Sequence, residues 1–234
     1  MNPLWRDILV NVVSDLLFVV LVSVLAMCLY WAPRLLRRDP ASRFFGLRLS
    51  EPGVIYVSGF PHERVTSRKV ANALEYDAAI RLRDALRPSA LGSLAPRLVR
   101  WLAGVVGQDI PIPEWNIAVA PLEPVDRLPP ERALISIGGP VANRLTAYFL
   151  ADQPQFRFDL TSGKYEERAE GRYVPIEPSG GVAIVEKVVV GDTTAILTHG
   201  FGEEHTAAAA QYLARNWRAM FRKHGQKPFG FRVT

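Results

Sequence analysis

The sequence predicts an α/β protein: an N-terminal transmembrane helix, then a three-layer domain with a mixed, largely parallel sheet and an antiparallel hairpin extension. Three observations predict this class. Residues 16–32 carry no charged side chain. From residue 53 onward, strand-like and helix-like segments alternate, which favours a sheet covered by helices. Three strand-like runs pass through glycine into a helix-like run, at 54–66, 133–145 and 194–207.

The first element is the apolar segment. With the turn or two before it, 16–32 reaches the roughly 20 residues that a helix needs to cross a bilayer. Aromatic side chains at either end, Trp5, Tyr30 and Trp31, suit the two interfaces. The alternatives are a buried core helix or a cleaved signal peptide, but "MNPLWRD" lacks the basic start of a signal peptide. Asn11 and Asp15 would favour helix–helix association in a membrane, hence a homo-oligomer through this helix.

The flanking charges give the orientation. Arginines at 34, 37, 38, 43 and 48 face one acid, Asp39, so this side should stay cytoplasmic. We therefore expect a single-pass protein of the cell membrane in three parts: 1–32 with the transmembrane helix, a juxtamembrane linker at 33–52, and a cytoplasmic ligand-binding domain at 53–234. The linker is basic and broken by prolines, and its aromatic residues could touch lipid headgroups.

Charge is unevenly distributed. Of the net charge of +5, residues 1–50 supply +3, and the rest of the chain is nearly balanced. A nucleic-acid-binding domain usually has a concentrated basic face, so nucleic acid is not an expected partner. The exception is 205–234, with six basic residues and no acid. This stretch is either a solvated face or a contact for anionic lipid or an anionic ligand.

The first half of the domain opens with a strand in "GVIYVSGFP" (53–61). Helical spacing then predicts a helix over 65–87, capped by Thr66 or Ser67 and ended by Pro88. A second helix is expected around 94–106. A proline-rich connection, 110–130, holds the short strand "NIAVA" (116–120).

The second half begins with a strand, a glycine turn and a helix in 132–152. Strand-like runs follow at 156–160, 171–176 and 182–190, and 188–199 is typical of a hairpin that turns at Gly191–Asp192. A final helix is expected over 206–224, with Gly225 as its stop.

The glycine junctions are the candidate site, because ligands of open α/β sheets bind outside the carboxyl ends of the strands. In "SIGGPVANRLT" (136–146), Gly138 and Gly139 allow close approach of the backbone, and Pro140 would start the helix. Exposed N–H groups there favour a phosphate or carboxylate. Asn143 could bond toward the strand ends, or it could be only a local helix cap.

The junction at "HGFGEEHT" (199–206) has a different character. Glu203 and Glu204 suit a helix N-terminus but would repel a phosphate, so an anion should prefer Gly138–Gly139. His199 and His205 do not form an HExxH pattern, and no metal site is expected. Glu75 or Asp77 could reach a ribose hydroxyl, although a solvated helix face explains both.

No catalytic motif is recognised and no cofactor is predicted. If the chain is an enzyme, the acid–base candidates are His199, Glu203 and Glu204. The expected ligand-binding residues lie at the three junctions and in the helix between them: Ser58, Gly59, Glu75, Asp77, Gly138, Gly139, Pro140, Asn143, His199, Gly200, Gly202 and Thr206.

"IYVSGFP", "LISIGGPVANRLT" and "ILTHGFGEEHTAAAAQYLARNW" occur in this order. The chain resembles, over 53–224, the Rossmann-like nucleotide-sensing domains of the SLOG type, found in prokaryotic conflict (defence) systems and sometimes fused to a membrane helix. The resemblance implies a membrane-anchored sensor or effector that binds a small, nucleotide-like ligand. The alternatives are a membrane-tethered hydrolase of nucleotides or N-glycosides on the same scaffold, and a tethered scaffold without a small ligand.

Overall fold

The computed structural model describes residues 12–27, 30, 40–47, 51–62, 65–86, 114–151, 154–177 and 181–233. The chain divides into two compact units, Met1–Arg38 with Pro88–Ile112, and Asp39–Arg87 with Pro113–Thr234. In the first unit, residues 12–27 form a helix with exposed apolar side chains. No helix in the described ranges is both long and apolar enough to cross a bilayer. Parts of the expected span 16–32, and the whole of the expected helix 94–106, fall outside those ranges.

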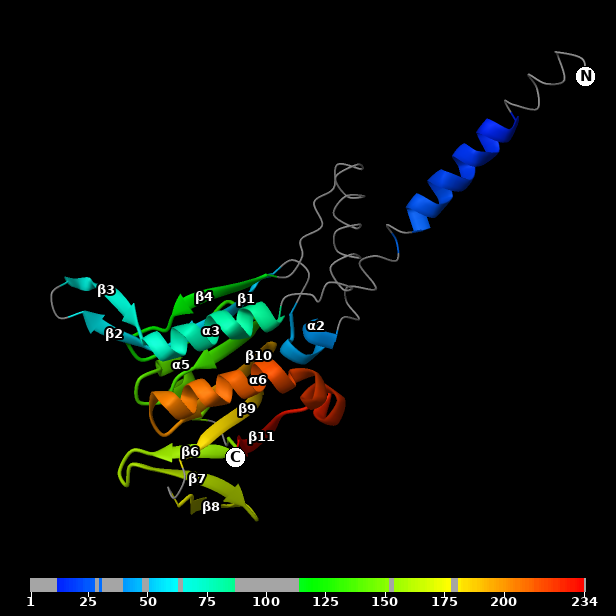
Figure 1. Cartoon of the computed structure of the whole chain (residues 1–234). Coiled ribbons are helices and arrows are strands. Elements are labelled where there is room, and N and C mark those ends of the chain that lie inside the picture. The colour runs from blue at the N-terminus through cyan, green and yellow to red at the C-terminus, as the bar shows by residue number, and fades with distance from the viewer. Residues whose placement is uncertain are drawn as a thin grey trace, which may run out of the picture. The chain divides into compact units, whose positions relative to one another are not determined.

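The second unit is built on a six-stranded sheet of order β11-β9-β10-β5-β1-β4 (Figure 1). Four neighbouring strands are parallel: β10 (Thr193–Gly200), β5 (Ala133–Ile137), β1 (Gly53–Val57) and β4 (Trp115–Val119). The antiparallel strands are β9 (Ala183–Val190) and β11 (Phe229–Val233). The predicted α/β class with a mixed, largely parallel sheet is confirmed, and so is the β9–β10 hairpin through Gly191–Asp192.

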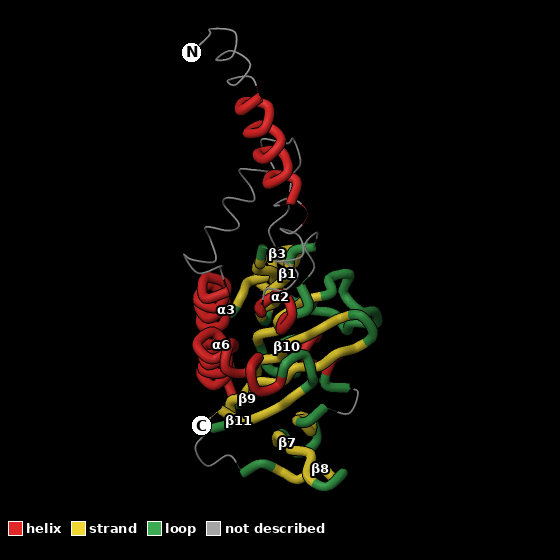
Figure 2. The backbone as a smooth tube through the Cα atoms, turned by 90° about the vertical axis from the view of Figure 1, so that its right-hand side faces the viewer, coloured by secondary structure: helices red, strands yellow, loops and turns green. Residues whose placement is uncertain are grey.

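Helices cover both faces of this sheet (Figures 1 and 2). Successive residues of a strand point to opposite faces. Accordingly, Ile135 and Ile137 pack in the core formed with α2 (Pro40–Phe45), α3 (Ala73–Leu86) and α6 (Gly202–His224). Leu134, between them, packs on the other face with Phe149 of α5 (Arg144–Phe149). Burial on both faces explains why β5, ALISI, is apolar at every position except Ser136.

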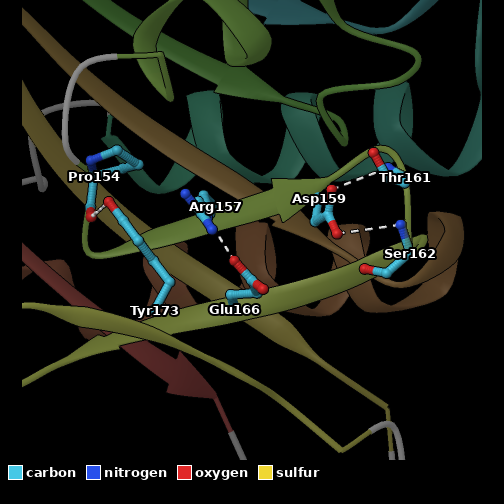
Figure 3. A network of polar contacts seen from close by, with 7 residues as sticks. All are labelled: Pro154, Arg157, Asp159, Thr161, Ser162, Glu166 and Tyr173. Carbon is cyan, nitrogen blue, oxygen red and sulfur yellow. Dashed lines mark hydrogen bonds and ion pairs between the residues drawn. The ribbon is translucent and has the colours of Figure 1, made fainter.

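A small antiparallel sheet lies beside the end of the main sheet that is formed by β11 and β9 (Figure 1). Its strands are β6 (Phe156–Asp159), β7 (Lys164–Ala169) and β8 (Arg172–Pro175). Polar contacts hold it together (Figure 3): Arg157 Nε donates to Glu166 Oε2 at 2.5 Å, and the Tyr173 hydroxyl donates to Pro154 O at 2.7 Å. Buried Phe156, Tyr165 and Ile176 pack against Val182 and Ile184 of the main sheet region.

Two of the predicted helices begin at residues other than those expected from the sequence. The segment 65–71 is a strand, β3 (Val65–Ala71), paired with β2 (Gly59–His62), so Thr66 and Ser67 are not caps. α3 begins at Ala73 because the Asn72 side chain accepts hydrogen bonds from two first-turn N–H groups, those of Leu74 and Glu75. α6 begins at Gly202, four residues before the expected start, and ends at Gly225 as predicted, with φ +62° there.

The end of the expected juxtamembrane linker is part of the folded unit, which was not expected. α2 lies within 33–52, and its Phe44 and Phe45 are 0% and 1% exposed in the core rather than free to touch headgroups. Lys187 of β9 donates from Nζ to Phe44 O at 2.6 Å. Burial lowers the pKa of Lys187 to about 8. A buried cation thus fastens the last turn of α2 to the sheet, where the helix dipole favours positive charge.

Candidate functional site

The three glycine junctions lie at one edge of the sheet. Because β1, β5 and β10 are parallel neighbours, their carboxyl ends at Val57, Ile137 and Gly200 fall on the same side. Figure 1 shows α3 and α6 side by side, both beginning at this edge. This is the arrangement that the strand–glycine–helix pattern predicts.

Direct contacts join the junctions. Gly138 N donates to Thr198 O at 3.0 Å. A Cβ added at Gly138 would lie 2.0 Å from Ser58 Oγ, so the first two junctions touch. A Cβ added at Gly139 would lie 3.8 Å from Gly200 O, which brings the third junction to the second. We call Ser58–Gly59, Gly138–Asn143 and His199–Gly202 together the junction cluster.

Glu75 belongs to the cluster through its side chain. The carboxylate, in the first turn of α3, is 4% exposed and accepts a hydrogen bond from Ser58 N at 2.9 Å. Burial raises the pKa of Glu75; the Ser58 hydroxyl and N–H oppose that rise, and the negative charge of Glu203 adds to it. Glu203 itself accepts a hydrogen bond from Asn72 Nδ2. The starts of α3 and α6 are therefore coupled both electrostatically and by a hydrogen bond.

His199 is the most unusual member. Its side chain is 0% exposed, and neither ring nitrogen has a hydrogen-bond partner among the residues that the structure describes. Burial lowers the pKa of His199 to about 3, so the imidazole is neutral near pH 7. The Tyr165 ring lies over it, with 5.3 Å between centroids. The Tyr165 hydroxyl donates to Gly200 O at 3.4 Å.

Asn143 is the cap of α5, which was the local alternative. Its Oδ1 accepts from two first-turn N–H groups, those of Leu145 (3.1 Å) and Thr146 (3.3 Å), and its Nδ2 donates to Ile137 O at 3.1 Å. Pro140 lies in the preceding turn rather than in the helix, which begins at Arg144. The N–H groups expected for a phosphate are thus partly occupied by the fold.

The start of α6 is acidic and open. Glu203 and Glu204 are exposed in the first turn, and Gly202 adopts φ +77°. Thr206 is not the cap: its hydroxyl, inside the helix, donates to Gly202 O at 3.0 Å. The N-cap residue Phe201 provides no side-chain hydrogen bond. Two exposed carboxylates thus lie at this end of the cluster, and the preference of an anion for Gly138–Gly139 stays a prediction.

One expected residue lies away from the cluster, and two residues that contact the cluster, Tyr165 and Asn72, were not expected. Asp77 is on the exposed face of α3, in an ion pair with Arg81 at 2.8 Å. Tyr165 was missed because β7, "KYEERA", was not recognised as a strand. Asn72 could have been found, since Asn followed three residues later by Glu is typical of a helix start.

Within the described ranges, His, Cys, Asp and Glu form no group of three or more that could hold a metal ion. Comparisons with protein-family models, with curated proteins and with solved structures find no match. The α/β fold is therefore established by the sheet itself, and the resemblance to SLOG-type domains stays a prediction from the three sequence segments.

Proposed function

We propose that this chain is a single-pass, membrane-anchored sensor or effector whose Rossmann-like α/β domain binds a small, nucleotide-like ligand at the junction cluster. The observation that carries the proposal is His199. Buried polar groups are nearly always hydrogen-bonded, and one left without a partner costs about 1–3 kcal/mol. A residue of this kind at the carboxyl ends of parallel strands is well placed to meet a bound molecule.

The polar groups of the cluster favour the nucleoside part of such a ligand. A neutral imidazole can donate or accept one hydrogen bond at each nitrogen, according to its tautomer. Glu75 adds a buried carboxyl group that accepts a hydrogen bond from Ser58 N. A phosphate finds less support, because Asn143 occupies first-turn N–H groups of α5 and two glutamates lie at the start of α6. We infer that base and ribose hydroxyls provide most of the recognition.

The anchor in this proposal is the apolar segment 16–32. It is supported by the absence of charge over its length, by the interfacial aromatics and by the arginines that follow. By the positive-inside rule, the same arginines favour a cytoplasmic location for the α/β domain. Sensing would then occur inside the cell, with the membrane helix as the link to an effector or to a second copy.

The test uses the full chain purified in detergent. Small molecules released on denaturation are identified by mass spectrometry, and their affinity is measured by calorimetry. His199→Phe replaces the imidazole with a ring of similar size without polar nitrogens, so the fold should keep its melting temperature while the ligand is lost. His224→Ala is the control, because His224 lies at the far end of α6 against Phe229.

Equal retention of the ligand by His199→Phe and wild type would contradict the proposed site. Turnover of the released nucleotide, or of an N-glycoside, would instead support the hydrolase alternative with His199, Glu203 or Glu204 as its acid–base groups. Recovery of the full chain in the soluble fraction without detergent would contradict the proposed membrane anchor.

A further inference from the structure

A second surface of the α/β unit stands apart from the junction cluster. It comprises exposed basic side chains of the last turns of α6, of the turn after it and of α2, which we call the basic face: Arg43, Arg215, Arg218, Arg222, Lys223 and Lys227. Arg215, Arg218 and Arg222 are three, then four, positions apart and so lie on one side of the helix. The sequence from 205 to 234 contains no acid to interrupt it.

Contacts between aromatic and basic residues bring α2 into this surface. The Phe44 and Phe221 rings pack edge-to-face with centroids 6.1 Å apart. The Arg43 guanidinium lies 5.6 Å from the centroid of the Phe221 ring. Arg43 is therefore next to the last turns of α6, although it is far from them in sequence.

Within the described ranges the charges of the basic face have no ion-pair partner, whereas several arginines elsewhere on the unit do. Arg81, Arg132 and Arg157 each form an ion pair with a carboxylate. None of the six members of the basic face forms one with a described residue. The exposed arginines on one side of α6 repel one another, and no described carboxylate pairs with them, so the surface is poised to meet a negatively charged partner.

We propose that the basic face docks on the anionic headgroups of the bilayer that holds the apolar segment. Clusters of about four to eight Lys/Arg beside a membrane helix or along an amphipathic helix bind anionic lipid in this way. α2 begins ten positions after Tyr30. A bilayer holding that segment would thus lie within about 35 Å of α2, since ten residues span no more. This inference rests on the anchor of the proposed function but not on its ligand.

The test reconstitutes the full chain into lipid bilayer discs, either of phosphatidylcholine alone or with about one third phosphatidylglycerol to supply negative charge. A lysine-specific reagent then labels the exposed amines, and mass spectrometry reads each site. Lys223 and Lys227 should label roughly tenfold more slowly in the anionic discs. Lys164, exposed in the small sheet, is the internal control and should label equally in both. About 1 M salt should abolish the difference, because the screening length is then only about 3 Å.

Two matched variants complete the test. R215E/R218E/R222E should lose the protection of Lys223 and Lys227. R127E/R144E/R172E changes the net charge by the same amount at exposed positions elsewhere, and it should keep that protection. Equal labelling of the wild type in both discs would overturn the proposal, as would binding of RNA through these arginines with no dependence on lipid charge. If the chain does not remain with the discs, the anchor is wrong, and vesicles of the same two compositions then decide on the basic face by the same protection.

Discussion

Adding a methyl group at each of the two central glycines of the junction cluster should have different effects: a loss of stability at Gly138 and a loss of ligand affinity at Gly139. In Gly138→Ala the new Cβ would meet Ser58 Oγ at 2.0 Å and Asn143 Cβ at 2.9 Å, and φ at this residue is +141°. Ser58 and Asn143 are fully buried, and the bonds of Asn143 hold it in place. Backbone strain of about 1–3 kcal/mol and overpacking of a similar size give a loss of about 2–6 kcal/mol in the free energy of unfolding. For a domain of this size the melting temperature should fall by roughly 5–20 °C.

Gly139→Ala meets no such obstacle. Its Cβ would lie 3.6 Å from the Tyr165 hydroxyl and 3.8 Å from Gly200 O, which is ordinary contact. The free energy of unfolding should change by less than about 0.5 kcal/mol. Since the methyl group would stand where a ligand approaches the backbone, ligand affinity should fall while the fold remains.

Thermal unfolding of the full chain in detergent, followed by tryptophan fluorescence, measures both variants because Trp115 and Trp217 are buried in the core. Calorimetry with the co-purified ligand measures the second effect. A wild-type melting temperature for Gly138→Ala would refute the contact between the first two junctions. Unchanged ligand affinity in Gly139→Ala would show that this glycine serves only the turn.

Three further changes test the charges and the caps. Burial raises the pKa of Glu186 from 4.5 to about 7. The folded state therefore binds the proton more tightly than the unfolded state, and the free energy of unfolding falls by about 3 kcal/mol as pH rises from about 4.5 to 7. Glu186→Gln should flatten this pH dependence, as measured by urea unfolding. The same pH dependence in Glu186→Gln and wild type would contradict the assignment to Glu186. Lys187→Met removes the bond to Phe44 O, so amide hydrogen exchange should accelerate in α2 while β10 keeps its protection; uniform acceleration would mean global destabilisation instead. Asn72→Ala should cost about 0.5–2 kcal/mol as the loss of an N-cap, whereas Asp77→Ala, on the exposed face of the same helix, should cost less than about 0.5 kcal/mol.

The sheet and its edge were predictable because their signals are local. Strand-like runs rich in β-branched residues, each followed by or ending in glycine, mark β1, β5 and β10, and each strand has a mostly buried apolar centre. The turn at Gly191–Asp192 has the chemistry of a tight hairpin, so the antiparallel neighbour of β10 was also clear. Once these strands are parallel, the placement of their carboxyl ends follows without further information.

The remaining elements depend on partners that a local pattern does not contain. β7, "KYEERA", is mostly polar, and only its pairing with β6 and β8 makes it a strand. β3 has helix-like spacing, but its β-branched residues pair with β2, and the cap at Asn72 delays the helix. Phe44 and Phe45 looked like interfacial aromatics because their core contacts come from α6 and β4, far along the chain. The burial of His199 also depends on a distant partner, because the Tyr165 ring that lies over it comes from β7, a strand that was not recognised.

The bond that fastens α2 also has a consequence for synthesis. Phe44 leaves the ribosome 143 residues before the lysine that holds its carbonyl. At about 5–20 residues per second, roughly 7–30 s separate the synthesis of Phe44 from that of Lys187. The attachment of α2 to the sheet through Lys187 is therefore a late event, which forms only after β9 has been synthesised.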